Sequence, residues 1–253
     1  MKIIEQKTAR EIEYLRRAAQ ISAKVLSLLK EKLQPEIATI ELDILARKLI
    51  KEFGGRPAFL GYRGYPAAIC VSVNEELVHG IPRKDKILRA GDIVTIDLGI
   101  ELNGFYGDVA DTFALGPVSE EKEKLINTAH QAMAAAVKES LAGRRIGDIS
   151  AAIQQVIERN GFQAVREYIG HGIGRNLHED PAVPNFGTGG TGVKLEEGMV
   201  LAIEPMVNAG TWRTRVLADG WTVVTADGQL CAHCEQMVAI TRTGPEILTE
   251  LNE

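Results

Sequence analysis

Two aspartates lie on the two arms of one apolar segment, residues 93–113, whose alternation of residue types is typical of a β-hairpin. Its Asn103-Gly104 pair predicts a two-residue turn. Counting outward from that turn places Asp97 opposite Ala110, and Asp97 and Asp108 diagonally on one face. Diagonal neighbours lie roughly 7–8 Å apart at the backbone, close enough for both carboxylates to hold a cation. Buried without a partner, the two charges would repel each other, and a solvated outer face of the hairpin is the alternative.

A glycine-rich segment, residues 168–181, carries two of the five histidines of the chain. Its glycines indicate irregular backbone that lets a ligand approach closely. Neutral imidazole is a metal ligand, and near neutral pH it also transfers protons. His171 and His178 are therefore candidates for chemistry, although each alone is also typical of a structural histidine.

Two glutamates stand at the ends of apolar strands in the second half of the chain. Glu204 follows the apolar run 198–203, and Glu235 precedes the run 236–240. A charge inside such a strand needs a partner, although each glutamate alone is also typical of a strand end at the surface. His233 lies two residues before Glu235, so strand alternation places it on the same face as a near neighbour.

Together these acids and one histidine make a ligand set of mostly oxygen atoms: Asp97, Asp108, His171, Glu204 and Glu235. Such a set is unlike a structural thiolate zinc site and suits a pair of divalent ions such as Mn, Fe or Co, with Zn as a further choice. Two ions about 3.5–4 Å apart can share a hydroxide and polarise a substrate carbonyl, the arrangement of metal-assisted hydrolysis.

The elements that position these residues repeat along the chain. Capping residues and apolar periodicity predict a helix at 8–33, with a capping box at Thr8, and a second helix that Thr39 caps. A short strand is predicted at 67–73, and two further helices at 119–141 and from Gly147 to residue 161. Because the second pair of helices echoes the first, we expect one α+β domain, residues 1–253, of two similar halves, about 1–116 and 117–253, with a cleft between them.

Composition narrows the class of protein. The 253 residues carry a net charge of −5, which argues against a general nucleic-acid binder. Three cysteines without a framework spacing favour reduced thiols. The first residues lack the apolar stretch of a secretory signal, and no apolar run approaches the ~20 residues of a membrane span. The sequence therefore predicts a cytoplasmic protein without a specific nucleic acid or a membrane among its partners.

Over almost its whole length the sequence resembles type I methionine aminopeptidase. The resemblance is carried by HGIP at His79, IDLG and YGD around Asp97 and Asp108, GHGIG and HEDP from His171, AIEPM at Glu204 and a final acid at Glu235. It implies the pita-bread fold, with two pseudo-symmetric halves around a dimetal site, in its short bacterial form. In that family pattern Asp108 and Glu235 bridge the ions, with Asp97 on one ion and His171 and Glu204 on the other.

The resemblance also implies a reaction: removal of the N-terminal methionine from nascent proteins and peptides with a small second residue. A metal-bridged hydroxide would attack the scissile carbonyl, with Glu204 as the proton carrier. His178 would contact the carbonyl oxygen or the tetrahedral intermediate, and His79 the scissile amide nitrogen. The methionine pocket would be lined by Tyr65, Cys70, Leu177 and Trp221, with Phe59 and Tyr62 nearby. Core packing is the alternative for these aromatic residues.

Cofactors and partners follow from the same resemblance. Two divalent ions, Co, Mn, Fe or Zn, are implied, together with a structural monovalent cation. The partners are a peptide or nascent chain with a free N-terminal methionine and, transiently, the ribosome, and the protein is expected to be a monomer. Phe59 and Leu177 depart from the pocket residues of some relatives, and His233 beside Cys234 is an unexpected pair at the metal site.

Two other functions stay open at this point. The first is an X-Pro peptidase, such as a prolidase or aminopeptidase P, which shares the fold but usually carries an additional N-terminal domain. The second is a binding module on the same fold that recognises peptide or RNA without catalysis. The five intact ligand positions and the acidic charge weigh against the module.

Overall fold

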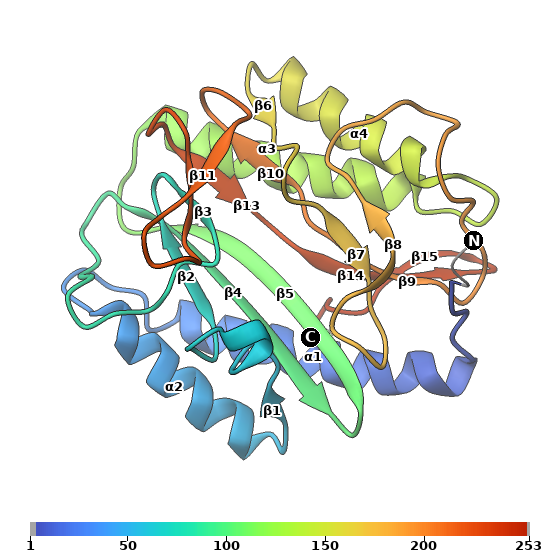
Figure 1. Ribbon diagram of the computed structural model, residues 1–253, viewed down its shortest axis with the longest axis horizontal. Helices are drawn as coiled ribbons and strands as arrows, with labels where there is room; N and C mark the ends of the chain where they lie inside the picture. Colours follow the sequence, from blue (N-terminus) through green and yellow to red (C-terminus); the bar gives the residue numbers. More distant parts are fainter. Residues whose placement is uncertain (1–3, 252–253) are drawn as a thin grey trace.

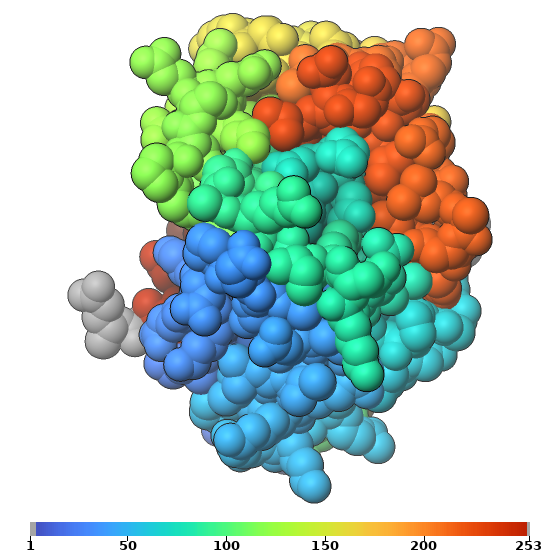
Figure 2. Space-filling model, turned by 90° about the vertical axis from the view of Figure 1, so that its left-hand side faces the viewer, coloured from blue at the N-terminus to red at the C-terminus, as the bar shows by residue number. Residues whose placement is uncertain are grey.

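The strands of the protein lie between two pairs of helices (Figure 1). In this computed structural model, which describes residues 4–251, the first pair is α1 (Ala9–Lys30) and α2 (Thr39–Glu52). The second pair is α3 (Glu120–Glu139) and α4 (Ile146–Arg159), on the opposite side of the strands. In Figure 2 the blue surface of the first helices lies below, and the lime and orange-red surface of the second half lies above.

Two larger sheets carry most of the site. The first contains β1 (Arg56–Pro57), β2 (Cys70–Val73), β4 (Ile93–Leu102) and β5 (Phe105–Ala114). The second has the order β15 (Gly244–Ile247), β14 (Gln236–Thr241), β9 (Val200–Ile203), β7 (Gly170–Gly172) and β8 (Glu179–Val183).

Two smaller sheets and a short helix complete the described part of the chain. One sheet contains β13 (Cys231–His233), β10 (Met206–Asn208) and β6 (Gln163–Ala164). The other contains β11 (Thr214–Val216), β12 (Val223–Thr225) and β3 (Glu76–Val78). A single 3₁₀ turn, η1 (Tyr62–Gly64), lies between β1 and β2.

The hairpin of β4 and β5 has the register that its turn predicts. Asn103 and Gly104 both have positive φ, 54° and 82°, as a primed two-residue turn requires. Asp97 is paired with Ala110 and Gly99 with Asp108, so the two aspartates lie diagonally on one face. The predicted register is confirmed, and both aspartates are buried.

The N-terminus of α1 has the predicted capping interactions, and the N-terminus of α2 does not. At α1 the Thr8 hydroxyl accepts from the Glu11 amide, and the Glu11 carboxylate accepts from the Thr8 amide, which confirms the capping box. The prediction that Thr39 caps α2 is wrong. Ala38 is the N-cap, and the Thr39 hydroxyl is engaged by the backbone of Arg83, 2.9 Å from its nitrogen and 3.1 Å from its oxygen.

Boundaries of four elements also differ from the prediction, among them the end of α1, which is Lys30 and not residue 33. The strand expected at 67–73 begins only at Cys70, because the amides of Ala68 and Ile69 donate to Asp43 Oδ1 on α2 at 2.6 and 3.3 Å. Helix α3 ends at Glu139 and not at residue 141, and α4 begins at Ile146, one residue before the predicted start. Long-range contacts of this kind override local sequence signals.

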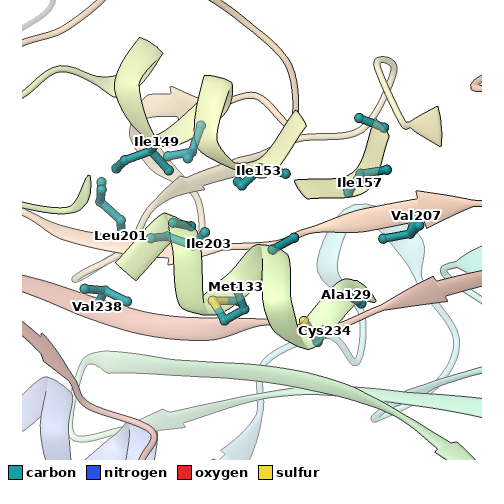
Figure 3. Close-up of a cluster of buried hydrophobic side chains, with 14 of the residues drawn as sticks. Ala129, Met133, Ile149, Ile153, Ile157, Leu201, Ile203, Val207, Cys234 and Val238 are labelled. Atoms are coloured by element: carbon teal, nitrogen blue, oxygen red, sulfur yellow. The ribbon is translucent and has the colours of Figure 1, made fainter. Parts of the chain in front are cut away.

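Each helix pair covers its own hydrophobic core. Between α3, α4 and the second sheet lie Ile149, Ile153 and Met133, facing Leu201 and Val238 (Figure 3). Helices α1 and α2 cover the first sheet with a separate cluster of fully buried side chains that includes Leu29, Leu42, Ile50, Ile96 and Leu98. Burial of this apolar surface stabilises both halves and fixes the strands between them.

Backbone hydrogen bonds join strand β5 to segments beside the second larger sheet, among them the bond from the Tyr106 amide to the Gly174 carbonyl at 3.0 Å. The amide of Glu235, the residue directly before β14, donates to the carbonyl of Ala110 on β5 at 2.8 Å and forms an isolated antiparallel bridge. Ala110 is also the residue opposite Asp97. This contact therefore brings an acid of the second half next to the two aspartates of the first.

Helix α1 touches the hairpin backbone directly at Gly107, next to Asp108. A Cβ atom on Gly107 would lie 2.4 Å from both the carbonyl carbon and the oxygen of Ala18. Such a separation is closer than any van der Waals contact and involves backbone that cannot rotate away. Gly107 therefore sets the distance between α1 and the strand that carries Asp108.

Replacing Gly107 by alanine is expected to lower the free energy of unfolding by about 1–3 kcal/mol, the usual cost of overpacking. Urea denaturation followed by circular dichroism measures this change. Gly189→Ala is the control, because a Cβ there meets only Asp148 Oδ1, at 3.3 Å, on an exposed loop. Equal stability of the two variants would contradict the close approach of α1 to β5.

Candidate metal centre

The five predicted ligands line one cavity of about 270 Å³ between the two halves. Asp97 comes from β4, Asp108 from β5 and His171 from β7. Glu204 directly follows β9, and Glu235 directly precedes β14. Residues that are far apart in the sequence thus converge on one wall of the cavity.

The imidazole of His171 has the geometry of a metal ligand. Its Nδ1 lies 2.8 Å from the carbonyl oxygen of Gly172, which places the ring proton on Nδ1 and leaves the lone pair of Nε2 free. Nε2 lies 3.4 Å from Glu204 Oε1 and 3.9 Å from Asp108 Oδ2. Two donors that each lie about 2.1 Å from one ion are about 3–4 Å apart, so these separations fit ligands of a shared cation.

Several buried side-chain atoms that could bind a metal ion lack any hydrogen-bond partner among residues 4–251. They include Asp108 Oδ1 and Glu235 Oε1. Donor atoms of Asp108, His171 and Glu235 lie within 4.8 Å of one another, and a second group shares Glu235 with Glu204 and His233. Unpaired buried carboxylate oxygens are costly. Their number, spacing and chemistry fit divalent cations.

Burial sets the protonation of these groups in the absence of a cation. It raises the pKa of Asp97 to about 7. Burial, followed by repulsion from neighbouring carboxylates, raises the pKa of Asp108, Glu204 and Glu235 well above the ordinary values. Burial lowers the pKa of His171 to about 3, so its ring is neutral at physiological pH, the form that binds metals.

The two other predicted catalytic histidines lie beside this group. The His178 ring centroid is 4.2 Å from that of His171, and the ring stacks on Tyr62 at 5.2 Å. His79 has a left-handed backbone, with φ of 59°, and its ring meets Tyr168 edge-on at 5.8 Å. Burial lowers the pKa of His178 and brings that of His79 to about 4, so both rings are neutral near pH 7.

Aromatic side chains form the apolar part of the cavity. Tyr65 and Trp221 meet edge-to-face with ring centroids 5.1 Å apart. The Tyr65 hydroxyl lies 3.1 Å from the Ile69 oxygen and 3.2 Å from that of Gly80, so it donates to backbone and its ring is fixed. The six predicted pocket residues all line the cavity: Phe59, Tyr62, Tyr65, Cys70, Leu177 and Trp221. A rigid apolar wall of this kind suits an unbranched side chain.

The structure adds lining residues that the sequence analysis did not single out: Arg63, Val78, Glu167, Tyr168, Ile169 and Met206. Some of them carry a local signal. Tyr168 lies two residues before β7, and Met206 lies two residues after Glu204. Proximity in sequence to the predicted ligands would have found these two residues and Glu167, which precedes Tyr168, whereas Arg63 lies in the turn η1, far in sequence from any ligand.

Comparisons with a family model and with known sequences point to the same family of metallopeptidases. A sequence model described as metallopeptidase family M24 matches residues 13–242. The methionine aminopeptidase of Clostridium perfringens is 52% identical over 96% of this chain and 97% of its own length. Methionine aminopeptidase 1 of Bacillus subtilis is 49% identical over 97% of this chain and 98% of its own.

Solved structures are similar over the same length. The crystal structure of methionine aminopeptidase from Thermotoga maritima has a TM-score of 0.97 and 45% identity, and the match covers 98% of this chain and 100% of that one. The prolidase from Pyrococcus furiosus has a TM-score of 0.80 at 24% identity, with 98% of this chain and 66% of that chain covered. The second match is a likeness of fold alone.

In the metal-free protein, the free energy of unfolding is expected to fall as the pH rises from 6.5 to 8. Over this window the unfolded chain has already released its carboxyl protons, whereas the folded state still holds protons on Asp97, whose pKa is about 7, and on its neighbours. Stability falls with pH wherever the folded state binds more protons. The lowered histidine pKa values act in the opposite direction, but mainly near and below the ordinary pKa of about 6.5, so they weaken the fall only at the start of this window.

Thermal unfolding with a chelator at pH 6.5, 7 and 8 measures this dependence. Addition of Mn²⁺ or Co²⁺ is expected to raise the Tm and to flatten its dependence on pH, and Asp97→Asn should flatten it without metal. Asp85→Asn, at a highly exposed carboxylate, is the control and should leave the slope unchanged. A metal-free protein whose stability rises over this range would contradict the assignment of protonated buried carboxyls.

Proposed function

The chain belongs to metallopeptidase family M24 and is a methionine aminopeptidase, and we propose that it cleaves at the candidate metal centre. The evidence for this activity is the similarity to methionine aminopeptidases over the full length of the chain. The fold is the α+β pita-bread class expected from the sequence. The description of the chain as one catalytic domain of two similar halves stays a prediction.

The two alternative functions, an X-Pro peptidase and a non-catalytic binding module, have less support. Similarity to prolidases is at the level of fold and leaves a third of the longer chain unmatched, so it gives no support to X-Pro specificity. A non-catalytic binding module does not need several carboxyl groups buried against one another, because their repulsion costs stability unless cations are bound. The convergence of five ligand-type side chains on one cavity therefore favours the enzyme.

The proposed ligand scheme follows the placement of the donors. Two divalent ions would be held by these five side chains, with Asp108 and Glu235 shared between them, Asp97 on one ion, and His171 and Glu204 on the other. The unpaired buried oxygens of Asp108 and Glu235 support their shared role, and the 3.4 Å separation of His171 from Glu204 supports theirs. Bound divalent ions supply a Lewis acid for the scissile carbonyl and lower the pKa of the attacking water.

The side chains of the protein move protons and stabilise charge in this scheme. Glu204 takes a proton from the attacking water and passes it to the leaving amine, a role that its raised pKa supports. His178, stacked on Tyr62, donates to the oxygen of the carbonyl as negative charge develops. His79, which lines the same cavity, contacts the amide nitrogen of the scissile bond.

Finer properties stay predictions. The methionine side chain would occupy the aromatic wall at Tyr65 and Trp221, and small second residues would be preferred. The native ions are expected to be Co, Mn, Fe or Zn, with a structural monovalent cation in addition. Transient ribosome contact, a monomeric state and a cytoplasmic location are expected as well. Among the described residues, no helix is long and apolar enough to cross a bilayer.

A peptide panel tests the activity. The metal-loaded protein is expected to release methionine from Met-Ala-Ser and to leave Ala-Pro and N-acetylated Met-Ala-Ser intact, because the reaction needs a free amine and a methionine-sized pocket. Product analysis by liquid chromatography measures release, and the chelated protein is the control. Cleavage of Ala-Pro with Met-Ala-Ser intact would instead favour the X-Pro peptidase.

Replacing His178 by alanine is expected to lower kcat for Met-Ala-Ser by about 10²–10³-fold, the usual cost of removing one donor to an oxyanion. Steady-state kinetics at saturating metal measures the change. The control is His130→Ala, a half-exposed histidine that pairs with Asp111 outside the cavity. Equal kcat values for the two variants would exclude His178 from the reaction.

A further inference from the structure

His233 is a buried polar residue to which the proposed chemistry assigns no role. Its side chain is 1% exposed, and neither ring nitrogen has a hydrogen-bond partner among residues 4–251. An imidazole always carries at least one N–H donor, and burying it unpaired is costly. A histidine in this state calls for an explanation within the structure.

The backbone of His233 is held by hydrogen bonds on both sides. The Thr112 hydroxyl on β5 donates to the His233 carbonyl at 2.7 Å and accepts from the His233 amide at 3.0 Å. On the other side, His233 pairs with Met206 in the ladder of β10 and β13. The point from which the ring projects is therefore fixed by two strands at once.

That ladder places His233 diagonally across from Glu204. Ile203 pairs with Gln236, and Met206 pairs with His233. Continuing the same register across the gap puts Glu204 opposite Glu235 and one diagonal step from His233, on the same face. The position of His233 thus follows from strand pairing.

The two oxygens of Glu204 face two different imidazoles. Oε1 lies 3.4 Å from Nε2 of His171, inside the cavity. Oε2 lies 3.9 Å from Nε2 of His233. Glu204 lines the cavity, whereas His233 is buried and is not among the lining residues, so it contacts the carboxylate from within the protein.

We propose that His233 is a positioning residue for Glu204: its Nε2–H donates to Oε2 and so keeps Oε1 directed at the ion shared with His171. The proposal rests on the metal centre proposed above. The 3.9 Å separation needs to shorten by about 1 Å to reach hydrogen-bond distance, within the reach of a small side-chain rotation. Ligand carboxylates are generally oriented by such outer donors.

Two substitutions at His233 distinguish a role as a hydrogen-bond donor from a role in filling space. His233→Gln keeps an N–H close to the position of Nε2, whereas His233→Leu fills the space without a donor. Calorimetric titration with Mn²⁺ should give an affinity of the Leu variant about 10–100-fold weaker than that of wild type, with the Gln variant within about threefold of wild type. His130→Leu, outside the cavity, is the control and should bind as wild type.

Kinetics and spectroscopy add readouts that a merely structural role would not move. For Met-Ala-Ser, the Leu variant should lose kcat while KM stays within about twofold, because Glu204 acts on the water and not on the side chain of the substrate. In the zinc-loaded wild type, ¹⁵N NMR of the histidine rings should show Nε2 of His233 protonated and hydrogen-bonded. This measurement needs no variant and is independent of turnover.

Three results would overturn the proposal. They are unchanged Mn²⁺ affinity of His233→Leu, failure of a folded His233→Gln to restore it, and an Nε2 of His233 bonded to the ion in the NMR experiment. The last result would make His233 a ligand. A wild-type protein that binds Mn²⁺ without cleaving Met-Ala-Ser would count against the proposed function, and the NMR and affinity tests would still decide the role of His233.

Discussion

The burial of four carboxyl groups around one small cavity is the constraint on which the rest of the structure depends. Taken from water without cations, such groups repel one another and hold protons, as the raised pKa values of Asp97 and its neighbours indicate. Two separate hydrophobic cores, one under each helix pair, supply the burial that offsets this unfavourable arrangement. The site is therefore rigid before any ion binds, because the strands that carry it are fixed from both sides.

The candidate metal ligands are held in place by the backbone of paired strands. Asp97 and Asp108 lie on one hairpin, which α1 touches at Gly107, and His171 lies on a strand paired on both edges. The bridge from the amide of Glu235 to the carbonyl of Ala110 then fixes the second half against the first. Since ligand distances decide metal affinity to within tenths of an ångström, positions on paired strands are better suited to this task than loops.

Local rules predicted the parts of the site that depend on short-range geometry. The turn at Asn103-Gly104 and the two-residue alternation of strands determine that Asp97 and Asp108 share a face, and both were accessible from the sequence. The convergence of His171 with the aspartates was not, because it depends on the packing of strands far apart in the chain, and only the family resemblance supplied it. The same limit explains the error at Thr39, whose hydroxyl is engaged by a distant backbone at Arg83.

The junction between β9 and β10 shows how strand pairing itself produces a functional carboxylate. The ladder is regular at Ile203 and resumes at Met206, and between them the shared register sets Glu204 against Glu235. Pro205 has no amide to donate, and the Glu235 amide donates to Ala110, so the regular ladder is interrupted here, although the Cys234 amide still donates to the Pro205 carbonyl at 3.3 Å. The interruption frees both carboxylates to turn toward the cavity. Because the neighbouring pairs hold the chain on each side, the interruption is confined to the place where the two carboxyl groups lie beside the other candidate ligands.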